Sequence, residues 1–395
     1  MNLLIISNYW HFVNEKSSSR YNTIAEMALR AGCNVEVVTS SFYHTKKQQR
    51  NKTEIVSEYP FTLIKEPSYK KNVSVKRIIS HSKFAKGVEK YLKTREKPDV
   101  IYLFVPPTGL AKRVIKFANK NNIRVIIDVL DLWPEAFEMV LPKFVKPLLF
   151  SIKHSAEYVY KNADDIVAVS KAYVEKVKGY NKKYSEALPV YIGTDLTVFD
   201  GYAKDAVDLD GKIRPITMAY IGMFGKSYDL IFAMEAMKEL IAEGFDEIEF
   251  LVMGSGPMRE EFESFAVSNN LPVRFTGRLS YEDMVKKLVK CDFSINVLNG
   301  KSFASIINKH SDYLAAGIPT INIQKDREFS DLVEEYNAGF VCPLNDIEAL
   351  KQSMKTLAEN EELRLEMSKN ARKLAEDLFD RNNTYPAIIN LINKK

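Results

Sequence analysis

Two residues three positions apart, Lys309 and Asp312, are the most informative candidates for chemistry in this chain. At this spacing the two side chains share one face of a helix. An ammonium group can screen a diphosphate, while a carboxylate can accept hydrogen bonds from the two hydroxyls of a ribose. The pair therefore suits a nucleoside diphosphate better than a simple anion. The alternative is an exposed salt bridge between neighbouring helical turns, which contributes little stability.

The residues around this pair predict a short helix between two buried strands. An apolar run at 292–298 predicts the preceding strand, and residues 320–323 predict the following one. Gly317 and Pro319 end the helix between them. Because ligands collect at the carboxyl ends of parallel strands, the pair lies where a ligand is expected.

A glycine-rich turn after another predicted strand, at 217–222, offers a second set of candidates. Gly222 and Gly225 allow a tight turn that exposes backbone amides at the start of a helix, where phosphate is favoured. Lys226 in the same turn would cover the charge of a departing diphosphate. The spacing is not that of a P-loop. A tight turn with an exposed lysine is the structural alternative.

Two further strand ends carry similar signals. Gly254 and Gly256 form a turn that is closed by a proline, and no third glycine completes a dinucleotide-binding fingerprint. Arg278 follows the strand at 274–277 and could stack on a nucleobase. A turn of this composition is also common for structural reasons alone, and Arg278 could equally be a surface residue.

Taken in order, these segments resemble the retaining glycosyltransferases of the GT-B fold, in the large family 4 class. Residues 308–319 are similar to the S-K-x-x-E-Y-x-A-A-G-x-P element, and residues 220–226, 250–257 and 273–278 match further elements of that class. Residues 131–135 read D-L-W-P-E, as in bacterial members that build surface polysaccharides. One position departs from most of the family, because Ala304 stands where a glutamate is usual.

The resemblance implies an α/β protein with two facing Rossmann-like domains and a cleft between them. Residues 1–200 would bind the acceptor, residues 201–375 would bind the nucleotide sugar, and a helix within 376–395 would cross back to the first domain. The length of 395 residues fits two domains of roughly 200 residues each. Alternating apolar runs and helical patterns independently predict parallel sheets covered on both faces.

The expected strands of the first half end with a short one near the domain boundary. They span residues 3–7, 34–40, 100–105, 125–129, 166–170 and 190–192. The expected strands of the second half span residues 217–222, 249–253, 274–277, 293–298 and 320–323.

The implied activity is transfer of a hexosyl or N-acetylhexosaminyl group from a nucleoside-diphosphate sugar, with UDP expected, to a hydroxyl of a growing, lipid-linked surface polysaccharide. Lys226 and Lys309 would stabilise the leaving diphosphate. Asp131, at a strand end, would position or deprotonate the acceptor hydroxyl, or it would instead cap the turn before Pro134. Arg20 is expected on the acceptor side. The donor-binding residues would be Gly222, Gly225, Gly254, Gly256, Arg278 and Asp312.

No cofactor and no metal ion are expected, because the cations would replace magnesium and the donor motifs contain no D-x-D pair. Two alternative functions differ from a glycosyltransferase in what they would require or show. A sugar-nucleotide 2-epimerase of similar fold would need no acceptor. A non-catalytic nucleotide-binding partner in polysaccharide assembly, suggested by Ala304, would show no turnover.

Charge is divided unevenly along the chain. Residues 1–200 carry 32 Lys and Arg against 20 Asp and Glu, a net charge of +12, whereas the remainder carries −7. Residues 70–97 are the densest basic stretch and predict an amphipathic helix with Val75, Ile78, Ala85, Val88 and Leu92 on its apolar face. This helix would attract an anionic membrane surface, or it is only a solvated helix face. Nucleic acid is not expected, because the usual binding motifs are absent.

The remaining sequence features indicate a cytoplasmic protein at the inner face of the membrane. No apolar stretch approaches the roughly 20 residues that span a bilayer. The N-terminus reads as a strand rather than a signal peptide. The three cysteines are far apart, which favours a reducing compartment.

Overall fold

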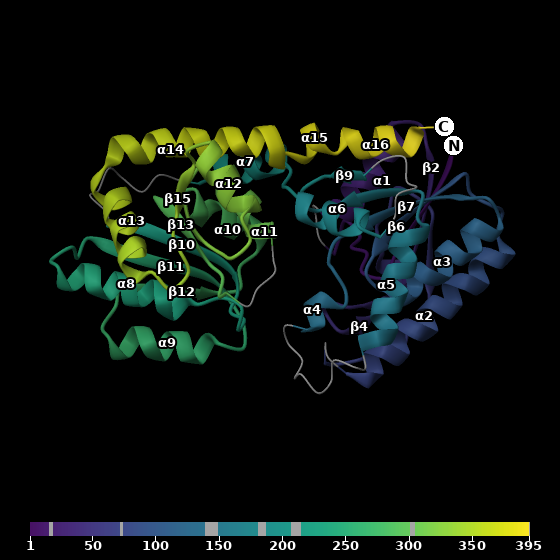
Figure 1. Ribbon diagram of the computed structural model, residues 1–395, viewed down its shortest axis with the longest axis horizontal. Helices are drawn as coiled ribbons and strands as arrows, with labels where there is room; N and C mark the ends of the chain where they lie inside the picture. The colour runs from purple at the N-terminus through teal and green to yellow at the C-terminus, as the bar shows by residue number, and fades with distance from the viewer. Residues whose placement is uncertain are drawn as a thin grey trace. The chain divides into compact units, whose positions relative to one another are not determined.

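The computed structural model describes residues 1–15, 19–71, 74–138, 149–180, 187–206, 215–300 and 305–394. The chain forms two compact units, drawn in Figure 1. The N-terminal unit consists of Met1–Tyr191 together with Thr384–Lys395, and the second unit consists of Ile192–Asn383. None of the described helices is both long and apolar enough to cross a membrane.

A seven-stranded parallel sheet forms the centre of the N-terminal unit, in the order β5-β2-β1-β6-β7-β8-β9. Its strands are β1 (Asn2–Ser7), β2 (Asn34–Ser40), β5 (Phe61–Ile64), β6 (Val100–Val105), β7 (Arg124–Val129), β8 (Asp165–Ala168) and β9 (Ala187–Pro189). A small antiparallel pair, β3 (Phe42–Tyr43) and β4 (Gln48–Gln49), follows β2. The apolar strand β6 is buried along its whole length, as expected for a strand covered on both faces.

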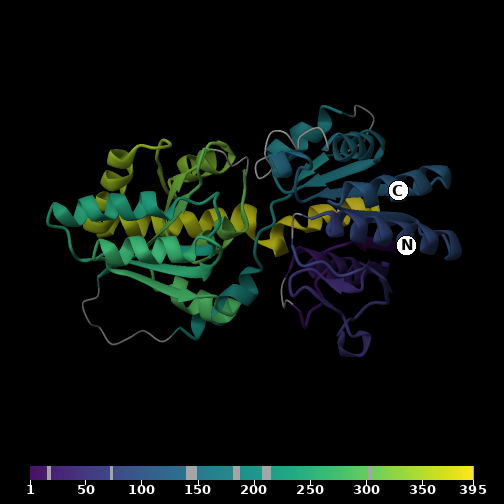
Figure 2. The ribbon, with the colours of Figure 1, turned by 90° about the horizontal axis from the view of Figure 1, so that it is seen from below.

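Helices cover both faces of this sheet. On one face pack α1 (Arg20–Arg30) and α16 (Pro386–Asn393), and on the other α2 (Val75–Thr94), α3 (Thr108–Lys120), α5 (Phe150–Asn162) and α6 (Lys171–Lys178). The short α4 (Glu135–Glu138) and a 3-10 turn at Lys52–Glu54 complete the unit. Figures 1 and 2 show α16, in yellow, beside the purple N-terminal segment. Tyr385, just before α16, is fully buried in this core.

The second unit is built on a six-stranded parallel sheet in the order β12-β11-β10-β13-β14-β15. Its strands are β10 (Ile216–Met223), β11 (Ile248–Ser255), β12 (Val273–Gly277), β13 (Phe293–Val297), β14 (Thr320–Ile323) and β15 (Gly339–Val341). Its helices are α7 (Leu196–Lys204), α8 (Leu230–Ala242), α9 (Arg259–Ser268), α10 (Tyr281–Leu288), α11 (Asn308–Ala315), α12 (Glu328–Glu335), α13 (Ile347–Glu359), α14 (Glu361–Leu374) and a π-helical turn at Ala375–Phe379. The short α15 (Arg381–Thr384) leads to α16.

The α/β class and the parallel sheets are confirmed, but one predicted strand is wrong. The last strand of the first half lies at Ala187–Pro189 rather than at 190–192. The carbonyl oxygens of Val190 and Tyr191 instead accept hydrogen bonds from Arg20 Nη1, at 3.0 and 3.2 Å. The Arg20 side chain thus takes the place of a neighbouring strand. Local β propensity does not reveal this contact, because Arg20 is distant in the sequence.

The basic helix forms as α2, but its apolar face is only partly as predicted. Ala85, Val88 and Leu92 are buried in the core of the N-terminal unit, together with Phe84. Val75 and Ile78 are instead 70% and 65% exposed. The reason is that the core covers only the C-terminal part of the helix.

A buried ion pair joins the first helix to the sheet. The Arg20 guanidinium donates to both carboxylate oxygens of Asp128, at 2.7 and 3.0 Å, and lies over the Tyr385 ring at 5.0 Å. Tyr102 Oη also donates to Asp128, at 2.8 Å. Burial lowers the pKa of Arg20, but the neighbouring Asp128 outweighs burial and holds that pKa above its usual value. Arg20 is thus a buried residue that ties α1 to β7. Its predicted place on the acceptor side stays a prediction.

Replacing Arg20 by Met should destabilise the protein strongly, because it leaves the Asp128 carboxylate buried without its cation. The expected loss is on the order of 3–5 kcal/mol in denaturant unfolding. The control is Arg327→Met, since Arg327 is 55% exposed and pairs with Asp331 on the surface. That variant should lose no more than about 1 kcal/mol. Equal losses of unfolding free energy in the two variants would show that the buried Arg20–Asp128 pair stabilises the protein no more than a surface pair does.

Candidate functional site

Lys309 lies in the first turn of α11, beyond the carboxyl end of β13, and is only 7% exposed. Its Nζ lies 3.8 Å from the ring centre of Tyr220 and 3.9 Å from that of Tyr228. Within the described chain Nζ has no hydrogen-bond or ion-pair partner. Burial lowers the pKa of Lys309 well below its usual value, while the two ring faces favour the charged form. The alternative interpretation, an exposed salt bridge between Lys309 and Asp312, is therefore wrong.

Gly222, at the end of β10, lies directly beside this ammonium group. Its φ is +132°, and a Cβ built on it would lie 3.9 Å from Lys309 Nζ. A glycine at this position keeps the backbone open toward the cation. Lys226 follows in the turn between β10 and α8, where it is exposed, and its carbonyl oxygen accepts a hydrogen bond from Asn299. The structure thus brings Gly222 and Lys309 together and leaves the Lys226 side chain in solvent.

The other predicted glycines have structural explanations. A Cβ on Gly254 would lie 1.8 Å from the Gly222 carbonyl oxygen, and one on Gly256 would lie 2.5 Å from that of Phe224. Both glycines therefore allow the turns after β10 and β11 to pack backbone against backbone. Gly225 has ordinary surroundings, with only a methionine sulfur 3.9 Å from a built Cβ. These residues shape the loop beside Lys309, and nothing in their geometry requires a ligand.

Asp312 and Lys309 contact different neighbours although they share a helix. The Asp312 carboxylate accepts a hydrogen bond of 2.8 Å from Tyr281 Oη, which also lies 2.8 Å from Thr194 Oγ1. Burial, and then the nearby Asp312 carboxylate, raise the pKa of Tyr281.

Arg278 is exposed after β12. Ala304, the departure from the family pattern, lies outside the described residues.

In the N-terminal unit, Asp131 follows β7 and is half-buried. Burial raises its pKa to about 6, although hydrogen bonds with the Trp133 side chain and the Leu132 backbone lower it in part. A carboxylate that titrates near neutrality is suited to accept a proton from a substrate hydroxyl. Both hydrogen bonds are local, so a role in shaping this turn is also consistent with the geometry.

A cluster of side chains that sequence reasoning missed surrounds this position. Arg77 lies over the ring of Trp133 at 5.5 Å and donates a hydrogen bond of 2.7 Å to Tyr9 Oη. The His81 ring stacks on Trp133, with ring centres 6.3 Å apart, and its Nε2 lies 3.2 Å from Tyr9 Oη. Arg77 and His81 are four residues apart on α2, so their shared helix face was the available signal.

The histidines of this cluster are neutral near pH 7. Burial, reinforced by Arg77, lowers the pKa of His81 to about 3. Burial, reinforced by Lys47, lowers the pKa of His44 to about 4, and His44 Nδ1 lies 2.6 Å from Tyr69 Oη. These rings can therefore exchange hydrogen bonds without adding charge. Among the described residues, no group of three His, Cys, Asp or Glu side chains could hold a metal ion.

Solved structures share this architecture over the whole chain. Sucrose-phosphate synthase from Thermosynechococcus elongatus matches 99% of this chain and 98% of its own, with 16% identity and a TM-score of 0.71. HepE of Anabaena in complex with UDP matches 99% of both chains, with 12% identity and a TM-score of 0.70. WaaG, a glycosyltransferase involved in lipopolysaccharide biosynthesis, matches 100% of both, with 15% identity and a TM-score of 0.67. The fold is that of the GT-B glycosyltransferases, with two Rossmann-like domains.

The sequence comparisons agree with this class. Residues 210–374 match the family of glycosyl transferases group 1, and this region contains every predicted donor-side residue. The chain is 23% identical over 220 residues to an uncharacterized glycosyltransferase of Methanocaldococcus jannaschii, covering 55% of this chain and 56% of that protein. It is also 23% identical over 243 residues to O-antigen chain mannosyltransferase C of Escherichia coli, covering 58% and 60%. The chain thus spans less than two thirds of these relatives.

The raised pKa of Asp131 predicts a stability difference that depends on pH. The folded-state pKa of about 6 exceeds the ordinary value of 3.8, so folding favours the protonated carboxyl. Its stabilising contribution is complete below the ordinary pKa and is lost as the pH rises through about 6. Asp131→Asn stays neutral throughout. Relative to the wild type, it should therefore gain on the order of 1.4 kcal/mol between about pH 5 and about pH 8.

Urea unfolding of the two proteins at both pH values measures this difference. Asp246→Asn, at an exposed carboxylate, is the control for removing one negative charge. If the unfolding free energies of the wild type and Asp131→Asn differ by the same amount at both pH values, the raised pKa of Asp131 is contradicted.

Proposed function

We propose that this protein is a retaining glycosyltransferase. It would move a sugar from a nucleoside-diphosphate sugar, with UDP as the nucleotide, to a hydroxyl of a growing, lipid-linked surface polysaccharide. The observation that carries this proposal is the buried Lys309 amino group, which has no hydrogen-bond or ion-pair partner within the described chain and whose pKa is lowered by burial. The match of residues 210–374 to group 1 glycosyl transferases supports it. So does the fold shared with HepE, which has been solved with UDP-glucose.

An isolated buried ammonium is costly, and the cost is offset only by a partner of opposite charge. A diphosphate beside Gly222, where a built Cβ would lie 3.9 Å from Lys309 Nζ, would supply that charge. The negative charge on the leaving diphosphate grows as the sugar bond breaks, so Lys309 would stabilise the transition state more than the bound substrate. Lys226, exposed in the same loop, would add a second cation when donor is present.

The acceptor side of the proposal centres on Asp131, whose carboxylate would take or orient the proton of the attacking hydroxyl. Attack on the face from which the diphosphate leaves would retain the configuration of the sugar. Lys309 and Lys226 would make a metal ion unnecessary. The basic surface of α2 would hold the protein at the inner face of the cytoplasmic membrane.

UDP binding should be coupled to proton uptake, because a diphosphate beside Lys309 raises its lowered pKa. We expect titration calorimetry in two buffers of different ionisation enthalpy to show uptake by the wild type. Lys309→Met should lose this uptake and bind UDP roughly tenfold or more weakly, as expected for a charged hydrogen bond. Lys238→Met, at an exposed position of α8, is the matched control. Wild-type uptake and affinity in Lys309→Met would disprove the donor site.

Asp131→Asn should lower turnover by roughly 10²-fold while UDP affinity is unchanged, because the carboxylate would act on the acceptor alone. Wild-type turnover should also fall below about pH 6 as Asp131 becomes protonated. The assay combines a UDP-sugar with a lipid-linked acceptor. Conversion of UDP-sugar without acceptor would indicate an epimerase, and UDP binding without turnover a non-catalytic partner. Full activity of Asp131→Asn would leave this residue with a structural role.

A further inference from the structure

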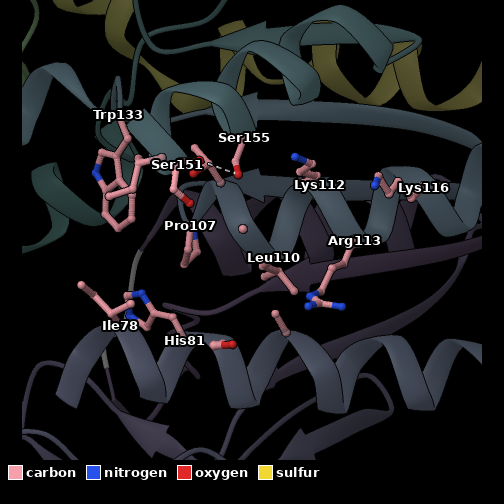
Figure 3. A pocket seen from close by; sticks show the side chains of 15 residues that line it. Ile78, His81, Pro107, Leu110, Lys112, Arg113, Lys116, Trp133, Ser151 and Ser155 are labelled. Atoms are coloured by element: carbon pink, nitrogen blue, oxygen red, sulfur yellow. Dashed lines mark hydrogen bonds between the residues drawn. The ribbon is translucent and has the colours of Figure 1, made fainter. Parts of the chain in front are cut away.

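A pocket lies among α2, α3 and α5 of the N-terminal unit, next to the side chains around Asp131, and the chemistry proposed above uses none of its cations. Its volume is about 470 Å³, and residues of α2, α3 and α5 line it, with Pro107 and Trp133 at one end (Figure 3). The lining cations all come from α3 and are Lys112, Arg113 and Lys116. None of the described residues that line the pocket is acidic. The chemistry of its wall therefore favours an anionic ligand.

Two of these three cations are not neutralised by a carboxylate within the described chain. Arg113 pairs with Glu89 at 2.7 Å. Lys112 and Lys116 instead each lie 5.4 Å from the ring centre of Tyr158. The first turn of α3 also lines the pocket and has no side-chain cap, so its amide groups add to the donors available to an anion.

Apolar side chains are exposed around the same pocket. Ile78, which lines it, is 65% exposed, and Val75 one turn earlier on α2 is 70% exposed. Phe150, at the start of α5 beside the lining residue Ser151, is 74% exposed. Exposed apolar groups beside a cationic pocket indicate a ligand with an anionic head and an apolar chain.

We propose that this pocket binds the phosphate groups of the lipid-linked acceptor, with the lipid chain lying against Val75, Ile78 and Phe150. This inference rests on the proposed transfer to a lipid-linked glycan. Trp133 provides the link to the chemistry, because it lines the pocket and hydrogen-bonds Asp131. A glycan whose phosphate occupies the pocket would therefore begin close to the proposed acceptor carboxylate.

Binding of farnesyl diphosphate to the full-length protein tests the proposal, with UDP titrated in parallel. The double variant Lys112→Gln/Lys116→Gln should bind farnesyl diphosphate at least about tenfold more weakly and bind UDP normally. Lys86→Gln/Lys90→Gln changes the net charge equally at exposed positions of α2 outside the pocket, and it should bind both ligands like the wild type. Gly109→Leu should also weaken farnesyl diphosphate, because a Cβ at Gly109 enters open space within the pocket lining.

Each other outcome has a distinct meaning. Equal weakening by both double variants would overturn the pocket in favour of general charge attraction. Absence of farnesyl diphosphate binding alongside normal UDP binding would overturn this inference and leave the proposed transferase function standing. Binding of farnesyl diphosphate without UDP would support the pocket and disprove the donor site. If phosphatidylglycerol vesicles, but not farnesyl diphosphate, required Lys112 and Lys116, the surface would be a membrane contact and the acceptor site would be refuted.

Discussion

Both sheets consist of parallel strands, and this constraint decides where chemistry can occur in each unit. All carboxyl ends of a parallel sheet meet at one edge, where loops and helix N-termini expose backbone amides that no strand neighbour uses. Lys309 and Gly222 reach this edge from β13 and β10 of one sheet, and Asp131 reaches it from β7 of the other. Residues distant in sequence become neighbours there because the strands are hydrogen-bonded side by side.

Buried ionisable side chains have two kinds of surroundings in this protein. Arg20 and Asp128 satisfy each other, with Tyr102 and two backbone carbonyls completing the network. Lys309 is buried without such a partner in the described chain, and the pKa of Asp131 is raised by its surroundings. Paired charge contributes to folding, whereas charge that burial disfavours reduces stability and is available for a ligand. This contrast separates the structural arginine from the proposed functional lysine more clearly than residue type does.

Local sequence patterns predicted the sheets and placed Lys309 and Asp131 at strand ends, since strand ends and glycine turns are encoded over a few residues. They did not predict the burial of Arg20, because its partner Asp128 is 108 residues away. They also gave no reason to group His44 with His81, although both lie near Arg77. For Gly254 and Gly256, the sequence does not show that the backbone of Gly222 and Phe224 fills the space beside them, and their donor-binding role stays a prediction. In each case the missing information was a long-range contact.

The segment Thr384–Lys395 belongs to the N-terminal unit although it is the last part of the chain. Tyr385, Ile388, Leu391 and Ile392 fill the core between the sheet and α1. During synthesis the ribosome therefore delivers the whole second unit before the first unit can close its apolar face. Until that segment is made, part of the core of the nascent N-terminal unit stays uncovered, and this apolar surface is accessible to a chaperone.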